Sequence, residues 1–404
     1  MISVRLSLLV AAVLLAAQWS FVQTKAAGGA NPALSAQAQK DFADLAQRAA
    51  EARDKDKLDE ALSLYAEALR LKQDWAEGWW YLGTILYDRD RYPEARDALQ
   101  SLVALQPQNA SGWALLGLCQ YQTREYDRSL VNLQKARILG LSSSKELATV
   151  TRYHAAILMT RFEQFEVAFE ILREFTREQN EDQKIIEAFG INALRLPFLP
   201  MEVPPDKREA VLMAGRAAND WSARRTDDAR KGFEGLVARY PKMPNVHYMF
   251  GAFLLTDNPD KALDEFRKEL EVSPSHAPAM LQIAFEYIKR GEYPAARPFA
   301  EKAVNLQPNL FPARNAFGRV LLETGDVAGA IRELEAGVKL AEDSPEMHFV
   351  LARAYAKAGR KEEAARERET FTKLDKLMRT QREGAQSVGG VGAKPDDKKP
   401  DQMK

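Results

Sequence analysis

Few side chains in this sequence could support covalent or metal chemistry. It contains one cysteine, Cys119, and four histidines, His154, His247, His276 and His348. One cysteine cannot form an internal disulfide, and with four scattered histidines it cannot supply a Cys/His zinc cluster. The His-Glu-x-x-His, Gly-x-Ser-x-Gly and Walker patterns are absent from the sequence. We therefore expect no metal, no cofactor and no enzymatic activity.

One nucleophilic pair, Cys119 with His154, is conceivable if the segments that carry them stack side by side. The sequence indicates no third group that would orient the histidine. Cys119 follows the apolar stretch 115–118, which is typical of a buried, unreactive thiol. The buried thiol is the interpretation that we favour.

The charge balance excludes some classes of partner. The 404 residues include 57 basic and 57 acidic side chains, so the formal net charge is zero. Such a chain has no general attraction to nucleic acid or to anionic lipid. We expect no nucleic acid partner.

The first 26 residues have the pattern of an export signal. Arg5 precedes an uncharged apolar run over residues 6–17, and small residues near Ala26 offer a cleavage site. An uncleaved membrane anchor is the alternative, because the apolar run can be extended to Val22 despite two polar interruptions. At about 17 residues this run is at the lower limit for crossing a bilayer. We predict export, with membrane contact only through residues 1–26 if they are retained.

Most of the remaining sequence repeats every 34 residues. Trp79 and Trp113 are separated by this interval, and so are Gly83 and Gly117. Each unit contains two runs with apolar residues at i, i+3, i+4 and i+7, which predict two amphipathic helices. Glycine on the first helix and alanine on the second allow the two helices to approach closely. The alanines of the second half are Ala262, Ala296, Ala330 and Ala364.

These positions resemble the tetratricopeptide repeat, whose pattern is Trp-x2-Leu-Gly-x2-Tyr, then Ala-x3-Phe, then Pro. The resemblance covers residues 42–378. It implies an all-α fold, a right-handed superhelical solenoid of stacked antiparallel helix pairs. His247 and His348 occupy the family's Trp position, so we expect them to be packing residues. One copy of the pattern reads Trp79-x2-Leu82-Gly83, then Ala95-x3-Leu99 and Pro107.

The repeats define the predicted domain organisation. Four prolines in the segment 196–205 predict a rigid, extended elbow that either divides two arrays or packs against them, and its apolar residues favour packing. The predicted regions are 1–26, a signal peptide or anchor; 27–41, a linker; 42–182, an N-terminal array; 183–209, an irregular helix with the elbow; 210–378, a C-terminal array; and 379–404, a disordered tail. The predicted repeats are 42–75, 76–109, 110–143, 149–182, 210–243, 244–276, 277–310, 311–344 and 345–378.

The resemblance implies a concave groove lined by the first helix of each pair, with groove-facing residues near positions 2, 5, 9 and 12. In the N-terminal half these positions are aromatic, which predicts a platform for an extended or helical peptide. Alternatively, these side chains fill the inner wall or contact residues 31–41. The aromatic residues are Trp80, Tyr87, Tyr121 and Tyr153.

In the C-terminal half the same positions carry Asn315, Arg319 and Arg353, with Lys289 and Lys357 one step further. Arg319 and Arg353 share a position in successive repeats, so their guanidinium groups could converge on an anion or a carboxylate. This is similar to chaperone-adaptor domains of the family, which hold a C-terminal carboxylate with a Lys/Asn set. The chain departs from that set by having Arg where Asn is expected. Alternatively, nearby acids such as Glu323 pair with these arginines.

The predicted function is a non-enzymatic protein–protein interaction scaffold that binds peptide segments or partner proteins in the groove. The chain resembles periplasmic or envelope tetratricopeptide proteins of bacteria, which implies a location in the cell envelope. One alternative is a membrane-tethered assembly or chaperone-like factor anchored by residues 1–26. Another is an enzyme with an unrecognised site.

Overall fold

The computed structural model describes residues 35–141 and 144–388, with side chains described up to residue 380. Within these ranges the regular structure is α-helical, apart from two short 3-10 segments, and no strand is present. The chain forms two compact units, Met1–Gly232 and Phe233–Lys404. The predicted all-α class is confirmed.

The first unit contains the helices α1 (Ala36–Asp54), α2 (Leu58–Leu71), α3 (Ala76–Asp88), α4 (Tyr92–Leu105), α5 (Ala110–Gln122), α6 (Tyr126–Leu139), α7 (Lys145–Arg161), α8 (Phe165–Arg177), α9 (Gln183–Ala193), η2 (Pro200–Glu202), η3 (Pro205–Lys207) and α10 (Arg208–Ser222). The unit boundary falls within α11 (Thr226–Arg239). The second unit continues with α12 (Val246–Leu254), α13 (Pro259–Val272), α14 (Ala277–Lys289), α15 (Tyr293–Leu306), α16 (Phe311–Glu323), α17 (Val327–Leu340), α18 (Pro345–Lys357) and α19 (Lys361–Val388).

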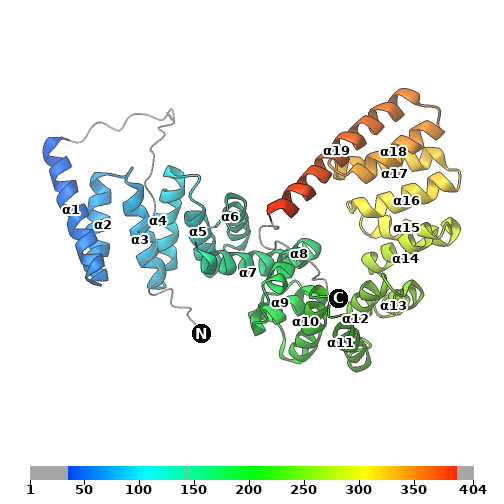
Figure 1. The fold of residues 1–404 in the computed structure, drawn as a ribbon, viewed down its shortest axis with the longest axis horizontal. Coiled ribbons are helices and arrows are strands. Elements are labelled where there is room, and N and C mark those ends of the chain that lie inside the picture. Colours follow the sequence, from blue (N-terminus) through cyan, green and yellow to red (C-terminus); the bar gives the residue numbers. More distant parts are fainter. Residues whose placement is uncertain (1–34, 142–143, 389–404) are drawn as a thin grey trace, which may run out of the picture. The chain divides into compact units, whose positions relative to one another are not determined.

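Consecutive helices pack as pairs in both units (Figure 1). In the first unit α1 packs on α2, α3 on α4, α5 on α6 and α7 on α8. The first helices also contact one another, α3 with α5, α5 with α7 and α7 with α9, and in the second unit α14 contacts α16 and α16 contacts α18. Within each unit these first helices therefore lie side by side, as in a repeat solenoid.

Small residues allow each pair to close. A Cβ atom added at Gly83 would lie 2.8 Å from the Cγ atom of Leu99 on the partner helix. Ala95, on the same partner helix, is completely buried. The turns between the paired helices need a left-handed residue, which is Gly325 (φ +95°) in one repeat and Asp90 (φ 57°) in another. The N-terminal repeats thus place non-glycine residues at this left-handed position, and the C-terminal repeats place glycine there.

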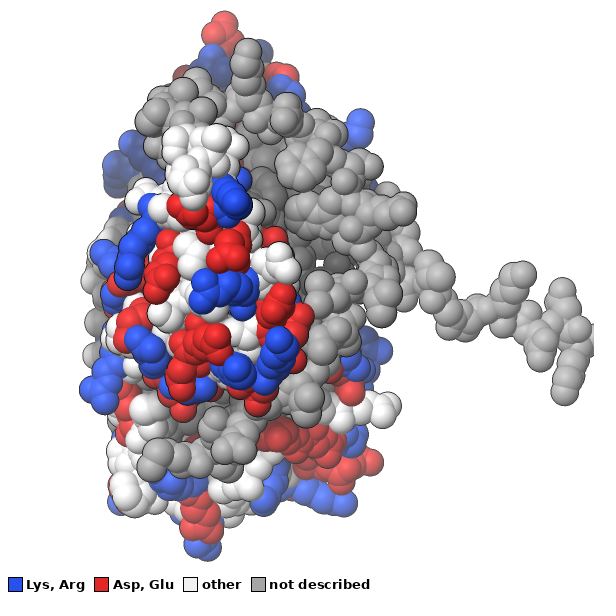
Figure 2. All heavy atoms as spheres, turned by 90° about the vertical axis from the view of Figure 1, so that its left-hand side faces the viewer, with Lys and Arg blue, Asp and Glu red and all other residues white. Residues whose placement is uncertain are grey.

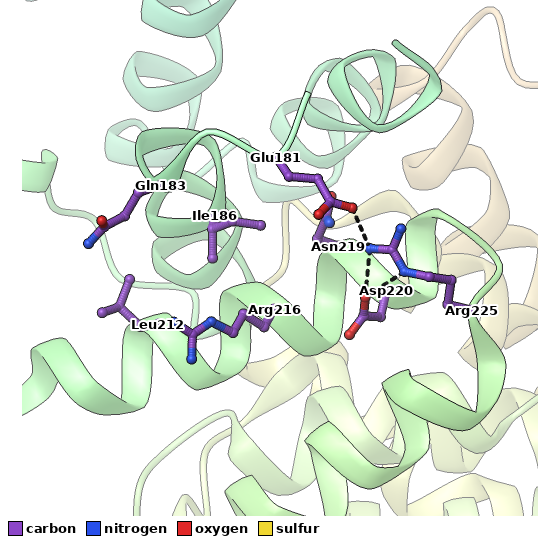
Figure 3. A pocket seen from close by; sticks show the side chains of 8 residues that line it. All are labelled: Glu181, Gln183, Ile186, Leu212, Arg216, Asn219, Asp220 and Arg225. Carbon is purple, nitrogen blue, oxygen red and sulfur yellow. Dashed lines mark hydrogen bonds and ion pairs between the residues drawn. The ribbon is translucent and has the colours of Figure 1, made fainter. Parts of the chain in front are cut away.

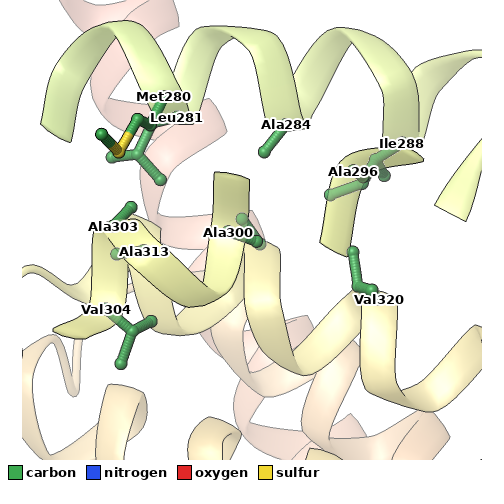
Figure 4. Packing of buried hydrophobic residues seen from close by; sticks show 11 residues of the cluster. Met280, Leu281, Ala284, Ile288, Ala296, Ala300, Ala303, Val304, Ala313 and Val320 are labelled. Carbon is green, nitrogen blue, oxygen red and sulfur yellow. The ribbon is translucent and has the colours of Figure 1, made fainter. Parts of the chain in front are cut away.

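Each helix pair contributes a local core. In the second unit, alanine, methionine and branched aliphatic side chains from α14, α15 and α16 pack together in one cluster (Figure 4). Ala284, Ala296, Ala300 and Ala316 are completely buried there. Stability is therefore distributed along the array instead of residing in one central core.

The ends of the described chain differ from the predicted boundaries. Helix α1 begins at Ala36 and is capped by the Ser35 hydroxyl, which accepts a hydrogen bond from the Ala38 amide at 3.2 Å. The last part of the predicted 27–41 linker is therefore helical. At the other end α19 continues to Val388, so the first ten residues of the predicted disordered tail 379–404 are helical. The predicted signal or anchor, 1–26, lies outside the described residues, as does 389–404. None of the described helices is both long and apolar enough to cross a membrane.

The proline-rich segment packs against the first unit. Leu199 and Val203 are buried, and the Arg161 guanidinium donates to the Pro197 carbonyl oxygen at 3.1 Å and pairs with Glu202. Of the two predicted arrangements, packing is the one observed. Helix α9 before the segment and α10 after it pack directly on each other, so the segment 183–209 does not divide the chain.

Candidate binding site on the first helices

The four predicted aromatic residues lie on three first helices that contact one another. Trp80 and Tyr87 belong to α3, Tyr121 to α5 and Tyr153 to α7. Trp80, Tyr87 and Tyr153 are half-buried, whereas Tyr121 is only 8% exposed. Trp80 makes no ring contact with the three tyrosines in the described structure. Of the four predicted residues, the three tyrosines are thus the ones whose rings contact other aromatic rings.

His154 joins two of these tyrosines. Its ring centroid lies 4.6 Å from that of Tyr121 and 5.3 Å from that of Tyr153, both in edge-to-face geometry. The Nδ1–H group donates to the Val150 carbonyl oxygen at 2.8 Å. Burial lowers the pKa of His154 to about 4, so the ring is neutral at pH 7 and its Nε2 atom is an acceptor. The sequence pattern did not identify this residue as part of the site.

The three tyrosine hydroxyls keep their protons. Burial raises the pKa of Tyr121 to about 12, and it also raises the pKa values of Tyr87 and Tyr153. In the described part of the chain none of the three hydroxyls forms a hydrogen bond with another protein group. Each can therefore donate to, or accept from, a bound molecule.

A second pair of tyrosines extends the aromatic surface. Tyr92 and Tyr126 are the first residues of α4 and α6, and their rings lie 5.6 Å from Tyr87 and 5.7 Å from Tyr121. Tyr92 and Tyr126 are 34 residues apart, as are Tyr87 and Tyr121. The repeat period could have identified Tyr92 and Tyr126. The groove-facing positions implied by the family resemblance, however, lie only on the first helix of each pair.

The predicted basic set is paired within the chain. Arg319 pairs with Glu346 at 3.4 Å, and Arg353 pairs with Glu323 at 2.6 Å. Asn315 is only 3% exposed. The structure therefore has the alternative arrangement, in which nearby acids pair with these arginines. The two guanidinium groups bind separate carboxylates and do not converge on one anion site.

The other basic side chains of this set are also engaged. Lys357 donates its Nζ to the Leu322 carbonyl oxygen at 2.7 Å. Lys289 lies 3.6 Å from Glu286.

The Cys119–His154 pair does not form. Cys119 is completely buried, and burial raises the pKa of its thiol to about 12. His154 uses its Nδ1–H for Val150 and forms no hydrogen bond with the thiol. The thiol therefore stays protonated and unreactive.

A cavity of about 380 Å³ lies between α9, α10 and the turn before α9 (Figure 3). Arg225 crosses one side of it and pairs with Glu181 at 2.9 Å and with Asp220 at 2.7 Å. Ile186 and Leu212 supply apolar walls. The acids of this cavity are therefore engaged by Arg225. No cluster of three or more potential metal ligands occurs among the described residues.

Acidic and basic side chains alternate on the face shown in Figure 2. Helix α1 illustrates how they pair, with Arg48 beside Asp44 and Lys55 beside Glu51. Neither sign of charge dominates this face, in agreement with the net charge of zero.

Comparison with known proteins identifies the repeats. The sequence pattern of the tetratricopeptide repeat family matches residues 52–119 and 315–367. Among solved structures, a fragment of MamA from Desulfovibrio magneticus RS-1 is 22% identical, with a TM-score of 0.38 over 43% of this chain and 97% of that one. YrrB, described as a TPR protein with an unusual peptide-binding site, is 18% identical, with a TM-score of 0.37 over 41% of this chain and 86% of that one. The comparison with curated proteins gave no match.

Proposed function

Because the chain is a tetratricopeptide repeat protein, we propose that it is a non-enzymatic scaffold that binds segments of partner proteins on the first-helix wall of residues 76–161. The observation that carries this proposal is the row of Tyr87, Tyr121 and Tyr153 on successive first helices, with hydroxyls that have no hydrogen-bond partner among the described residues. Repeat solenoids use such concave walls to bind other proteins.

The chemistry of the wall favours a peptide ligand. Aromatic side chains offer a large contact area at low entropic cost, and their hydroxyls can bond to a peptide backbone. The Nε2 atom of His154 adds an acceptor between two of the rings. A peptide supplies both N–H donors and carbonyl acceptors, so it can satisfy all of these groups.

We further propose that the scaffold works in the bacterial cell envelope, which the signal-like residues 1–26 support. If those residues are retained, the protein is a membrane-tethered assembly factor instead of a free periplasmic one. N-terminal sequencing of the mature protein separates these two possibilities.

Replacement of Trp80 and Tyr121 by Ala tests the scaffold function. We expect the double variant to capture fewer envelope proteins in a pull-down than the native chain, because each aromatic anchor of an interface is worth about 1–3 kcal/mol. Crosslinking in the native compartment followed by mass spectrometry then identifies the captured proteins.

The matched control is Trp113→Ala, which removes an aromatic residue from α5 whose indole N–H is bonded to the Pro107 carbonyl oxygen. Circular dichroism verifies that each variant keeps its helices. Undiminished capture by a fully helical Trp80/Tyr121 variant would contradict the proposal.

A further inference from the structure

Three second helices of the first unit begin with an aromatic residue, Tyr92 in α4, Tyr126 in α6 and Phe165 in α8. Two of these rings carry a guanidinium group from the next repeat. The Arg161 Cζ atom lies 5.6 Å from the Tyr126 ring centroid, and the Arg195 Cζ atom lies 4.4 Å from the Phe165 centroid. Arg161 is the last residue of α7, and Arg195 lies in the turn after α9. Both cations thus come from the end of the next first helix, Arg161 from its last residue and Arg195 from the left-handed turn position that Arg124 occupies after α5.

Each of these guanidinium groups also has a carboxylate partner. Arg161 pairs with Glu202 at 2.5 Å, and Arg195 pairs with Glu166 at 2.7 Å. At both positions the chain itself therefore supplies the ring, the cation and the acid.

The position of Tyr92 has the ring and the acids but lacks the cation. The next first helix, α5, ends in the neutral residue Gln122 where α7 ends in Arg161. Arg124, in the turn after α5, forms no ion pair and contacts no ring in the described structure. Tyr92 nevertheless donates its hydroxyl to Asp90, and Asp88, the last residue of α3, interacts electrostatically with the adjacent Tyr87.

Neither Asp88 nor Asp90 is part of an ion pair in the described chain. The neighbouring arginines are already engaged, Arg89 with Asp59 at 3.1 Å and Arg91 with Glu94 at 3.0 Å. The pKa of Asp88 is raised, mainly because its carboxyl group is partly desolvated and also because the Asp90 carboxylate lies nearby. Two carboxylates beside two half-buried rings thus carry negative charge that no ion pair among the described residues neutralises.

We propose that Tyr87, Tyr92, Asp88 and Asp90 form a binding site for the guanidinium group of an arginine side chain from a partner protein. This inference rests on the proposed function, because it names one side chain that the partner segment carries. The arginine would take the place that Arg161 takes over Tyr126. A guanidinium group suits the site better than an ammonium group, because it stacks on a ring and forms paired hydrogen bonds with carboxylates.

The site can be tested with two short peptides and the full-length chain. Acetyl-Ala-Arg-Ala-amide is titrated into protein with isotope-labelled tyrosine rings, and acetyl-Ala-Gln-Ala-amide is the neutral comparison. NMR resonances are assigned with Tyr87→Phe and Tyr92→Phe. We expect the Arg peptide to shift the Tyr87 and Tyr92 signals, and the Gln peptide to leave them unchanged. Equal shifts with both peptides, or shifts confined to other tyrosines, would overturn the inference.

Two variants test the charges. Asp88→Asn with Asp90→Asn should weaken binding of the Arg peptide by about fivefold or more, the range of an exposed cation–π contact and ion pair. Asn tolerates the left-handed conformation of residue 90 and can still accept from Tyr92, so the turn should be preserved. Asp74→Asn with Asp127→Asn, two exposed acids outside the site, is the charge-matched control and should bind normally.

Gln122→Arg supplies the missing cation from within the chain and should block the Arg peptide. If the pull-down depends on Trp80 and Tyr121 while the Arg peptide does not bind, the scaffold function stands and the arginine site is wrong. If the Arg peptide binds but no envelope protein is captured, the site stands and the scaffold function fails.

Discussion

One side-chain position shows how different residue types fill the same role. Near the start of five first helices, a side-chain N–H bonds to the backbone carbonyl oxygen six residues earlier. The residue is tryptophan, arginine or histidine, depending on the repeat. The pairs are Trp79 with Gln73, Trp113 with Pro107, His247 with Pro241, Arg314 with Pro308 and His348 with Glu342, at 2.7–3.0 Å. Sequence similarity understates this equivalence, because the conserved element is one N–H group.

Histidine adds a charge at this position. In His247 the Nε2 atom faces the Pro241 carbonyl oxygen, and the Nδ1 atom lies 2.6 Å from the Glu265 carboxylate. Both partners are acceptors, so both ring nitrogens must carry a proton. The hydrogen bond with Glu265 raises the pKa of His247 despite its burial. Lys268 pairs with the other oxygen of Glu265 at 2.7 Å, and the buried Glu269 lies nearby.

His247→Gln should therefore remove a pH-dependent part of the stability. A histidine whose folded-state pKa is raised stabilises fully below its unfolded value of about 6.5 and loses this contribution as the pH rises through the folded-state value. We expect the variant to be less stable than the native chain by roughly 1–3 kcal/mol at pH 6, the range for a hydrogen bond to a charged group, with a smaller difference at pH 9.

Urea unfolding followed by circular dichroism at several pH values measures this effect. His154→Gln is the comparison of opposite sign: the pKa of His154 is lowered to about 4 in the folded chain, below the unfolded value of about 6.5, so its contribution to stability rises between pH 6 and 9 and its removal should take that rise away. A native slope between pH 6 and 9 that is identical in His247→Gln would contradict the assignment.

Among the helices, the closest approach joins α9 and α10. A Cβ atom at Gly190 would lie 1.8 Å from the Val211 carbonyl oxygen, and one at Gly215 would lie 2.0 Å from the Ile186 carbonyl oxygen. The obstacle in both cases is backbone, which cannot rotate away. At Gly83 the obstacle is the Leu99 side chain, which can adopt another rotamer.

The two kinds of contact predict different costs. Gly190→Ala should lower the free energy of unfolding by about 3 kcal/mol or more, at or above the upper end for overpacking. Gly83→Ala should cost about 1 kcal/mol, because the alanine fits a helix and only a side chain must move. Urea unfolding of both variants measures the difference, and equal losses would show that α9 and α10 can separate freely.

The helices of the repeats were predictable because their signals are local. Repeats predicted to start at residues 76 and 110 begin as α3 and α5 at those residues, where the Trp, Gly and Ala positions recur. The packing of α9 on α10 was not predictable, because the contact of Gly190 with Gly215 occurs once and has no period. From the sequence, the proline-rich segment 196–205 could either divide two arrays or pack against them, whereas the boundary between the two compact units lies within α11.

The candidate site was predictable only in part, for a similar reason. Tyr87 and Tyr121 follow the repeat period, but the role of His154 depends on which of its nitrogens bonds to the Val150 carbonyl oxygen. The pairing of Arg353 with Glu323 is a choice among flexible side chains that spacing alone does not make.

For the whole molecule, the net charge of zero reflects local pairing. Each unit binds most of its arginines to acids of the same or the neighbouring repeat, and exposed pairs of this kind contribute about 0–1 kcal/mol each. Each pair cancels one charge of each sign, so the pairing lowers the local charge while adding little to the stability.

The same nearest-neighbour organisation predicts how far the destabilising effect of one substitution extends along the array. Because each helix pair packs mainly on adjacent pairs, a defect at one junction should raise the opening rate of its neighbours and little else. In Gly190→Ala we expect hydrogen exchange to accelerate in α9 and α10. The acceleration should become smaller in each helix pair toward α3. Helices α14 to α18, which build their own cores, should keep native protection. Mass spectrometry of the exchanged full-length chain resolves these segments. A uniform loss of protection across both units would instead indicate that the array unfolds as a single cooperative body, and the stability of distant repeats would then depend on the α9–α10 junction.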